Sequence, residues 1–167
     1  MCIRDSFKAD IKGNSSLTNY DVDILIKNDT TASFSAKGNL DVSGKKSNLD
    51  LDLKFKDFIL DPLNPFGGGA ITNIRGFVTG SSKITGRLEK PQINGALILD
   101  KGGISVPYLN IDYAFEDNTK INLAAQSFVF EAANFTDTTF SSKGILRGKM
   151  SHNNFANWSL DTTIDSE

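Results

Sequence analysis

The sequence predicts an all-β protein in which an antiparallel meander curls over on itself. Apolar and polar residues alternate along most of the 167 residues, which is typical of strands with one buried face. Short polar turns join the alternating segments, and no long apolar segment of helical period interrupts them. About a dozen strands are expected, more than an open twisted sheet holds without curling. The sheet is therefore predicted to close as a barrel, a sandwich or a U-shaped trough.

Three expected strands open the alternating region. Residues 20–26 and 32–42 alternate, and a polar turn follows each of them. The cleanest alternation lies at 49–55, where Asp50 and Asp52 take the parity opposite to the leucines and the phenylalanine. We expect these carboxylates to lie on a solvated strand face.

One segment, near residues 62–74, does not alternate. Pro62 and Pro65 suit the opening turn of a short helix, whereas the glycines at 67–69 weaken it. We expect a short helix or a compact loop whose apolar residues pack against the sheet.

Residues 76–95 are predicted to form a two-stranded ribbon with no chemistry of its own. Apolar residues alternate between five positions that serve as structural turn markers. These positions are Gly76, Gly80, Gly86, Pro91 and Gly95. Further strands are expected around 97–106, 109–115, 121–132 and 144–164.

Composition excludes several classes of function. The net charge is −2 and basic residues are scattered singly, whereas nucleic-acid binders concentrate them on one face. The single histidine, His152, falls in an expected polar turn without a second imidazole nearby, so we expect a surface residue and not a metal ligand or catalytic base. No enzymatic activity, catalytic residue, metal site or cofactor is predicted.

The two ends of the chain differ from the rest. Residues 1–6 fall outside the alternating pattern, and we interpret them as a non-native tail. The sequence stops within an alternating run at 164–167. We therefore expect residues 7–167 to be a fragment of a longer protein.

The sequence is rich in phenylalanine, with 12 Phe against 3 Tyr and 1 Trp. The ordinary interpretation is that these rings fill the core of a sandwich. The alternative is a groove too wide to be filled by its own side chains, which would hold acyl chains. Composition alone favours the filled core.

The spacing of glycines and apolar residues resembles the C-terminal region of the TamB family. The similarity covers residues 50–167, whereas residues 7–49 share only the β-ribbon character. It rests on Gly76-x-x-x-Gly80, Ile84-x-Gly86, Pro91-x-Ile93-x-Gly95-x-Leu97, Ile111-x-Tyr113, Phe135-Thr136-Asp137 and the stretch from Gly144 to Phe155.

This resemblance implies a β-taco-like fold of the AsmA-like group, an elongated U-shaped trough with an apolar interior. It also implies the periplasmic part of an envelope protein anchored in the inner membrane, which carries phospholipid towards the outer membrane. An Omp85-type, TamA-like outer-membrane partner would bind through regions outside this chain.

The residues expected to line such a groove and contact acyl chains are the inward apolar ones. They are Leu51, Leu53, Phe55, Leu97, Leu99, Ile111, Tyr113, Phe115, Ile121, Leu123, Phe128 and Phe130.

Two competing functions remain open at this point. One is an assembly module for outer-membrane β-barrel and autotransporter proteins, which pairs its strand edges with client strands. The other is a closed adhesin-like sandwich with a dry, filled core.

Overall fold

The computed structural model describes residues 5–14, 16, 18–28, 31–43, 47–67, 69, 71–153 and 156–166. These residues form strands and two short 3-10 helices, so the all-β prediction is confirmed. The elements are β1 (Asp5–Gly13), β2 (Asn19–Asn28), β3 (Thr31–Asp41), β4 (Asn48–Ile59), η1 (Asp61–Gly67), β5 (Thr72–Arg87), β6 (Lys90–Val106), η2 (Pro107–Leu109), β7 (Ile111–Phe115), β8 (Thr119–Ala125), β9 (Ser127–Asp137), β10 (Lys143–Asn153) and β11 (Ala156–Ser166).

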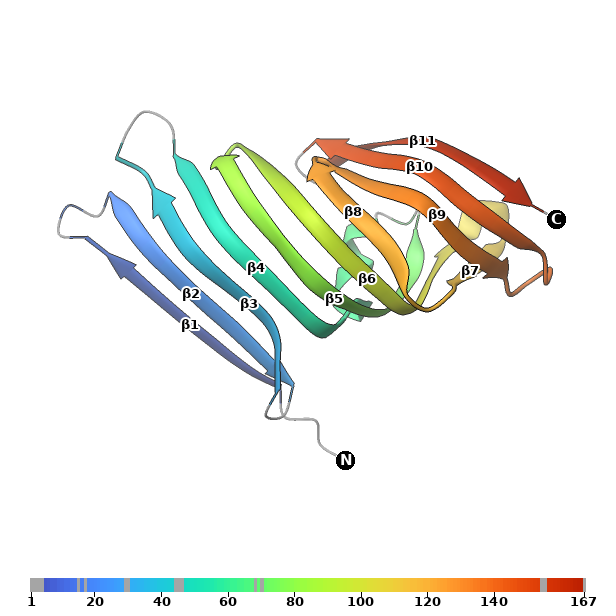
Figure 1. Cartoon of the computed structure of the whole chain (residues 1–167), viewed down its shortest axis with the longest axis horizontal. Helices are drawn as coiled ribbons and strands as arrows, with labels where there is room; N and C mark the ends of the chain where they lie inside the picture. The colour runs from blue at the N-terminus through green and yellow to red at the C-terminus, as the bar shows by residue number, and fades with distance from the viewer. Residues whose placement is uncertain are drawn as a thin grey trace.

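The strands belong to one antiparallel sheet and follow each other across it in nearly their order in the chain (Figure 1). The path runs β1-β2-β3-β4-β5-β6-β7-β9-β10-β11, and β8 pairs with β6 and β9. Neighbours in sequence are therefore neighbours in space, as expected for strands joined by short turns. The meander prediction is confirmed.

Strands β7 and β8 share one position in the sheet, between β6 and β9. On β6, β8 pairs with residues 93–99 and β7 with residues 103–106. The two registers differ by a single residue, and the same shift separates their pairings with β9. A bulge at residues 116–118 thus interrupts one long strand. The sheet continues through it as a single layer.

A row of bulges bends the sheet across its middle strands. Lys101 N–H donates to Asp117 Oδ1 at 2.7 Å, and Asn118 N–H donates to Asp100 Oδ1 at 2.8 Å, so the two bulges hold each other. Such bulges curve a sheet by adding a residue on one strand. Four residues of this row have positive φ: Asp57 (48°), Gly76 (109°), Lys101 (51°) and Asn118 (62°).

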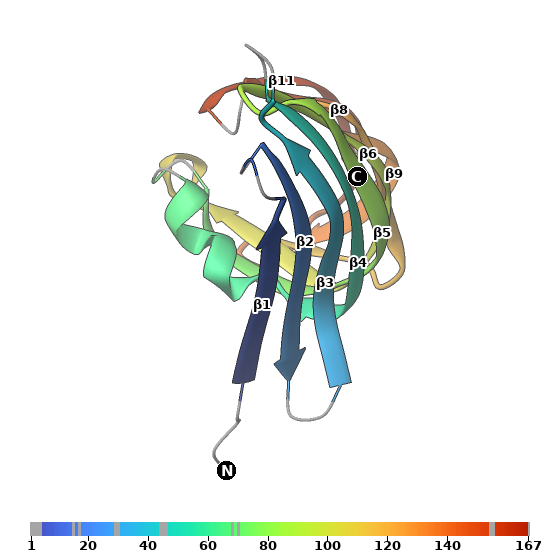
Figure 2. The same cartoon turned by 90° about the vertical axis from the view of Figure 1, so that its left-hand side faces the viewer.

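The bend gives the sheet a concave side, which we call the hollow side. In Figure 2 the backbone of the strands curves, and η1 lies on the concave side of the sheet. Three larger apolar residues near the bend are well buried: Val78 is 4% exposed, Leu99 5% and Phe135 5%. That this hollow forms a continuous trough belongs to the proposal below.

The predicted ribbon is one long hairpin of β5 and β6, whose turn joins Arg87 to Lys90. Gly86 and Pro91 pair beside this turn. The other three marker positions, Gly76, Gly80 and Gly95, lie within strands and not at turns, which corrects the sequence-based expectation.

Close backbone approach explains two of these glycines. A Cβ on Gly80 would lie 2.3 Å from the Ala96 carbonyl oxygen, and one on Gly95 would lie 2.3 Å from that of Ser81. A side chain at either position would therefore collide with the backbone of the neighbouring strand, so glycine is required there.

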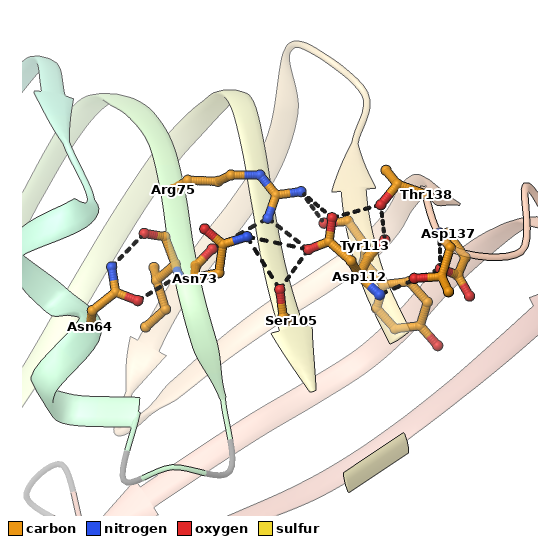
Figure 3. A network of polar contacts seen from close by, with 10 residues as sticks. Asn64, Asn73, Arg75, Ser105, Asp112, Tyr113, Asp137 and Thr138 are labelled. Atoms are coloured by element: carbon orange, nitrogen blue, oxygen red, sulfur yellow. Dashed lines mark hydrogen bonds and ion pairs between the residues drawn. The ribbon is translucent and has the colours of Figure 1, made fainter. Parts of the chain in front are cut away.

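The helix expected near 62–74 is confined to η1, because β5 already begins at Thr72. The Asn64 side chain fixes η1 to the start of β5. Its Nδ2 donates to the Ile74 carbonyl at 2.8 Å, and Ile74 N–H donates to its Oδ1 at 2.7 Å (Figure 3). The Asn64 side chain thus forms the two backbone hydrogen bonds of Ile74 that a neighbouring strand would otherwise form.

Of residues 1–6, which we interpret as a tail, the structure describes only Asp5 and Ser6. The backbone of Asp5 and Ser6 pairs with Asn28 and Lys27, so β1 includes both residues. Residues 1–4 lie outside the described residues. The origin of the segment stays a prediction.

Replacing Gly95 with Ala is expected to destabilise the fold by about 2–4 kcal/mol, because the new methyl group would collide with the backbone of β5. Urea denaturation followed by circular dichroism measures this. Gly67→Ala is the matched control, since its Cβ would meet nothing closer than 3.6 Å. Equal stability of the two variants would contradict the explanation.

Candidate functional site

The strand register gathers the apolar residues on one face of the sheet. Partners in an antiparallel pair project to the same side. Leu53 pairs with Ser82, Ser82 with Gly95, Gly95 with Leu123, and Leu123 with Phe128. One continuous row thus crosses β4, β5, β6, β8 and β9.

A parallel row runs beside it. Phe55 pairs with Gly80, Gly80 with Leu97, and Leu97 with Ile121. We call the surface formed by these two rows and their neighbours of the same parity the apolar face. Nine of the twelve predicted groove residues belong to its main part: Leu51, Leu53, Phe55, Leu97, Leu99, Ile121, Leu123, Phe128 and Phe130.

The remaining three predicted residues, on β7, lie beyond the bend. Tyr113 pairs with Ile104, two residues after Gly102, and a Cβ on Gly102 would lie 2.4 Å from the Leu99 side chain. The face of Leu99 therefore continues onto β7. There the Tyr113 ring lies 4.3 Å from that of Phe135, and the Phe115 ring lies 6.4 Å from it. Ile111, with the same parity as Tyr113, completes the set.

The apolar face is shielded only in part. No large side chain among the described residues is less than 2% exposed, and most residues of this face are half-buried. The opposite face is solvated, as predicted for Asp50 and Asp52, whose side chains are 62% and 67% exposed. Lys83 lies 2.8 Å from the Asp50 carboxylate. In a flat single layer the side chains of both faces would be equally exposed. Here the apolar face is the less exposed one, so we assign it to the hollow side.

Sequence reasoning missed several residues of the apolar face. Phe58 contacts Phe34 and Phe55 at ring distances of 5.8 and 5.9 Å, although it breaks the parity of residues 49–55. Asp57, with φ 48°, causes that break. Ala133, at 0% exposure, follows a similar register shift on β9. The positive φ of Asp57 is visible only in the structure, so the alternation of residues 49–55 alone could not have identified Phe58.

A polar network holds the strand ends beyond the bend. The Arg75 guanidinium donates to both Asp112 carboxylate oxygens, at 2.8 and 3.0 Å (Figure 3). Ser105 Oγ and Thr138 Oγ1 each donate to the same carboxylate at 2.6 Å. Asn73 adds a contact to Ser105 Oγ at 3.3 Å. β5, β6, β7 and the turn after β9 are thereby joined.

This network lowers the pKa of Asp112 well below its ordinary value. The hydrogen bond from Arg75 is the main cause, and burial opposes it; the hydroxyls of Ser105 and Thr138 add to the effect. The side chains of Arg75 and Asp112 are each 27% exposed. The network therefore has a structural role, since its carboxylate is fully engaged.

The expectation that His152 is a surface residue in a polar turn is wrong. The residue belongs to β10 and is only 9% exposed, with its ring 5.8 Å from that of Phe128. Burial lowers its pKa. The polar neighbours suggested a turn, but β10 extends to Asn153 and places the imidazole against an apolar-face residue.

The described residues contain no group of three or more His, Cys, Asp or Glu side chains placed to hold a metal ion. Within the same part of the chain, no helix has the length and apolar character needed to cross a bilayer.

Comparisons of the chain with protein-family models, with curated proteins and with solved structures give no match. The resemblance to the TamB family therefore stays a prediction, and the apolar face has to be interpreted from its own chemistry.

The Asp112 network predicts a pH-dependent stability. Because the pKa is lower in the folded state, the stabilisation is present above the ordinary value of 3.8 and decreases as the pH falls below it. Asp112→Asn should cost about 1–3 kcal/mol at pH 7 and less at pH 3. Urea denaturation at both pH values measures the difference.

Asp52→Asn is the control for this experiment, because that carboxylate is exposed and 3.9 Å from Lys83. It should change stability little at either pH. A cost of Asp112→Asn that is identical at pH 7 and pH 3 would contradict the assigned role.

Proposed function

We propose that the apolar face binds hydrocarbon, specifically the acyl chains of phospholipids, and that the chain acts as a passive conduit without catalysis. The observation that carries this proposal is a continuous apolar face on a single-layer sheet. The described strands form one sheet, and most side chains of this face are half-buried.

The energetics favour an apolar occupant. Burying hydrocarbon contributes about 0.8 kcal/mol per methylene, so an acyl chain with about ten methylenes in contact would gain roughly 8 kcal/mol. The two residue rows supply contact along β4 to β9. An acyl chain could move from one residue row to the next while it stays in contact with the apolar face, and a conduit requires such movement.

A closed sandwich fits these observations less well. Two sheets packed face to face bury their inner side chains in a shared core about 10 Å thick. Here the described strands form one sheet, and fully buried large side chains are not found among them. The phenylalanines of the apolar face, such as Phe55 and Phe128, are half-buried and available for contact with a ligand.

The resemblance to the TamB family supplies the setting of the proposal. It implies that the chain is the periplasmic part of an envelope protein, anchored in the inner membrane by a segment outside this chain. In that setting the acyl chains would belong to phospholipid that moves between inner and outer membranes. An Omp85-type, TamA-like partner would again engage regions other than this one.

One observation supports the alternative function, an assembly module that pairs its strand edges with client strands. Among the described residues, β1 and β11 each have a strand partner on one side only. Such edges can pair with an added strand. Lipid need not be bound in that case, which separates the two functions experimentally.

Replacing Ile93 with Asp should reduce the phospholipid that copurifies with the chain several-fold, because a carboxylate on the apolar face is costly to bury against acyl chains. Ile93 pairs with Ile84 and Ala125 and is half-buried. Mass spectrometry of the organic extract, normalised to protein, measures the bound lipid.

Gln92→Asp is the matched control, since Gln92 precedes Ile93 on β6 and is exposed on the opposite face. It adds the same charge and should leave the lipid content unchanged. Absence of lipid from the unmodified chain, after expression in a diderm host and after incubation with phosphatidylethanolamine vesicles, would contradict the proposed function.

A further inference from the structure

We propose that two adjacent strand connections at one end of the sheet insert their apolar tips into the surface of a phospholipid bilayer. The connections are residues 107–110, between β6 and β7, and residues 138–142, between β9 and β10. We call these two connections together the rim. The inference goes beyond the proposed function, because insertion of the rim does not require the apolar face to hold lipid.

Three large apolar side chains of the rim are exposed to solvent. Tyr108 is 94% exposed, Leu109 57% and Phe140 64%. Tyr108 and Phe140 are the two most exposed large hydrophobic residues in the part of the chain that the structure describes. Single exposed apolar side chains are common on protein surfaces, whereas a group of them marks a contact with a partner or a membrane.

The two connections lie next to each other at the same end of the sheet. Tyr113 pairs with Asp137, so the start of β7 lies beside the end of β9. Thr138 N–H donates to the Asp112 carbonyl oxygen at 2.8 Å, and its hydroxyl donates to the Asp112 carboxylate at 2.6 Å (Figure 3). Both connections join described strands on either side. Their apolar tips therefore belong to one short section of the sheet end.

Hydrogen bonds hold both tips in position. Asn110, with φ 52°, donates its N–H to the Pro107 carbonyl oxygen at 3.1 Å. In the other connection, Ser141 N–H donates to the Asp137 carbonyl oxygen at 2.7 Å, and Thr139 N–H donates to the Asp137 carboxylate at 2.9 Å. Because both turns are already closed, insertion into a bilayer has few further groups to order.

The rim is free of charge. Residues 107–110 and 138–142 contain no Asp, Glu, Lys, Arg or His. The adjoining Asp137 is only 3% exposed, and Lys143, which is exposed at the start of β10, suits the phosphate of a lipid head group. Charges usually fix the register of a protein–protein contact, and the rim offers none for that purpose.

The side chains of the rim suit the boundary between head groups and acyl chains. A tyrosine ring is amphipathic and is enriched at that level of a bilayer, while Leu109 and Phe140 provide hydrocarbon for the layer beneath. Thr139 and Ser141 flank Phe140 with hydroxyl groups that the head groups can hydrogen-bond. An uncharged tip with hydroxyls around an apolar centre therefore fits a bilayer surface.

The β5–β6 turn, at the opposite end of the sheet, differs in its charges. β5 runs from Thr72, which pairs with Ser105 near the rim, to Arg87 beside this turn. Leu88 in the turn is 51% exposed, but Arg87 and Glu89 flank it and form an ion pair at 3.2 Å. Inserting that turn would remove both charges from water, which is costly. Leu88 thus has the exposure of a rim residue without its surroundings.

The rim adjoins the apolar face. Ile111 begins β7 directly after the first connection and has the parity of Tyr113, whose ring lies 4.3 Å from that of Phe135. An acyl chain that leaves a bilayer at the rim would meet Ile111 first and Tyr113 next. If the proposed function also holds, the rim is where lipid enters or leaves the apolar face, and this step alone rests on that function.

The test is flotation of the full chain with vesicles of phosphatidylcholine and phosphatidylethanolamine through a density gradient. The unmodified chain should float with the vesicles. A rim variant that carries Tyr108→Ser, Leu109→Ser and Phe140→Ser should bind them roughly tenfold more weakly, because it loses the inserted apolar area. All three side chains are exposed, so circular dichroism should show an unchanged fold.

Leu88→Ser is the matched control for Leu109→Ser, since the two leucines are similarly exposed. Leu109→Ser should weaken vesicle binding several-fold, and Leu88→Ser should leave it unchanged. Ile93→Asp, on the apolar face, should float like the unmodified chain. A chain that floats but copurifies with no phospholipid would refute the proposed function and leave the rim proposal standing, so the two can fail separately.

Several outcomes would overturn the rim proposal. They are an unmodified chain that does not float, a rim variant that floats equally well, and a Leu88→Ser variant that loses as much binding as Leu109→Ser. Loss of flotation in Ile93→Asp but not in the rim variant would show that vesicles contact the apolar face instead. Self-association that the rim variant abolishes, without any vesicle binding, would identify a contact between copies of the chain.

Discussion

The backbone register of the sheet is the constraint on which the rest of the structure depends. Because Leu53, Ser82, Gly95 and Leu123 follow one another across paired strands, a shift of one residue in any pair would move that strand's apolar residues to the solvated face. Gly95 keeps this order, because a side chain there would collide with the backbone of β5. The bend therefore places one unbroken apolar face on the hollow side.

The polar network and the bulges also stabilise the bend of the sheet. Asp100 and Asp117 accept backbone N–H groups from each other's strands at the bend, while Arg75 and Asp112 join the strands beyond it. The polar groups are thus concentrated where the sheet changes direction, and the apolar face is left for other contacts. A half-buried hydrocarbon surface follows, and the proposed binding of acyl chains rests on it.

Alternation predicted the strands and their inward faces well, because a period of two survives wherever a strand is regular, as at Leu51 to Phe55. It failed at bulges, where Asp57 shifts the parity and brings Phe58 inward. It could not pair Arg75 with Asp112, since 37 residues separate them and only the folded sheet brings them together. His152 was misplaced because its polar neighbours resemble a turn, although they belong to a strand.

The central claim is that hydrocarbon, and not protein, covers the apolar face. NMR of the methyl-labelled chain with a zwitterionic phospholipid tests it most directly. The account predicts nuclear Overhauser contacts from the lipid methylene protons to the δ-methyls of Ile121 and Leu123, and none to the methyl of Ala96, which is exposed on the opposite face. Methylene contacts that are absent from Ile121 and Leu123, or equally strong at Ala96, would contradict it.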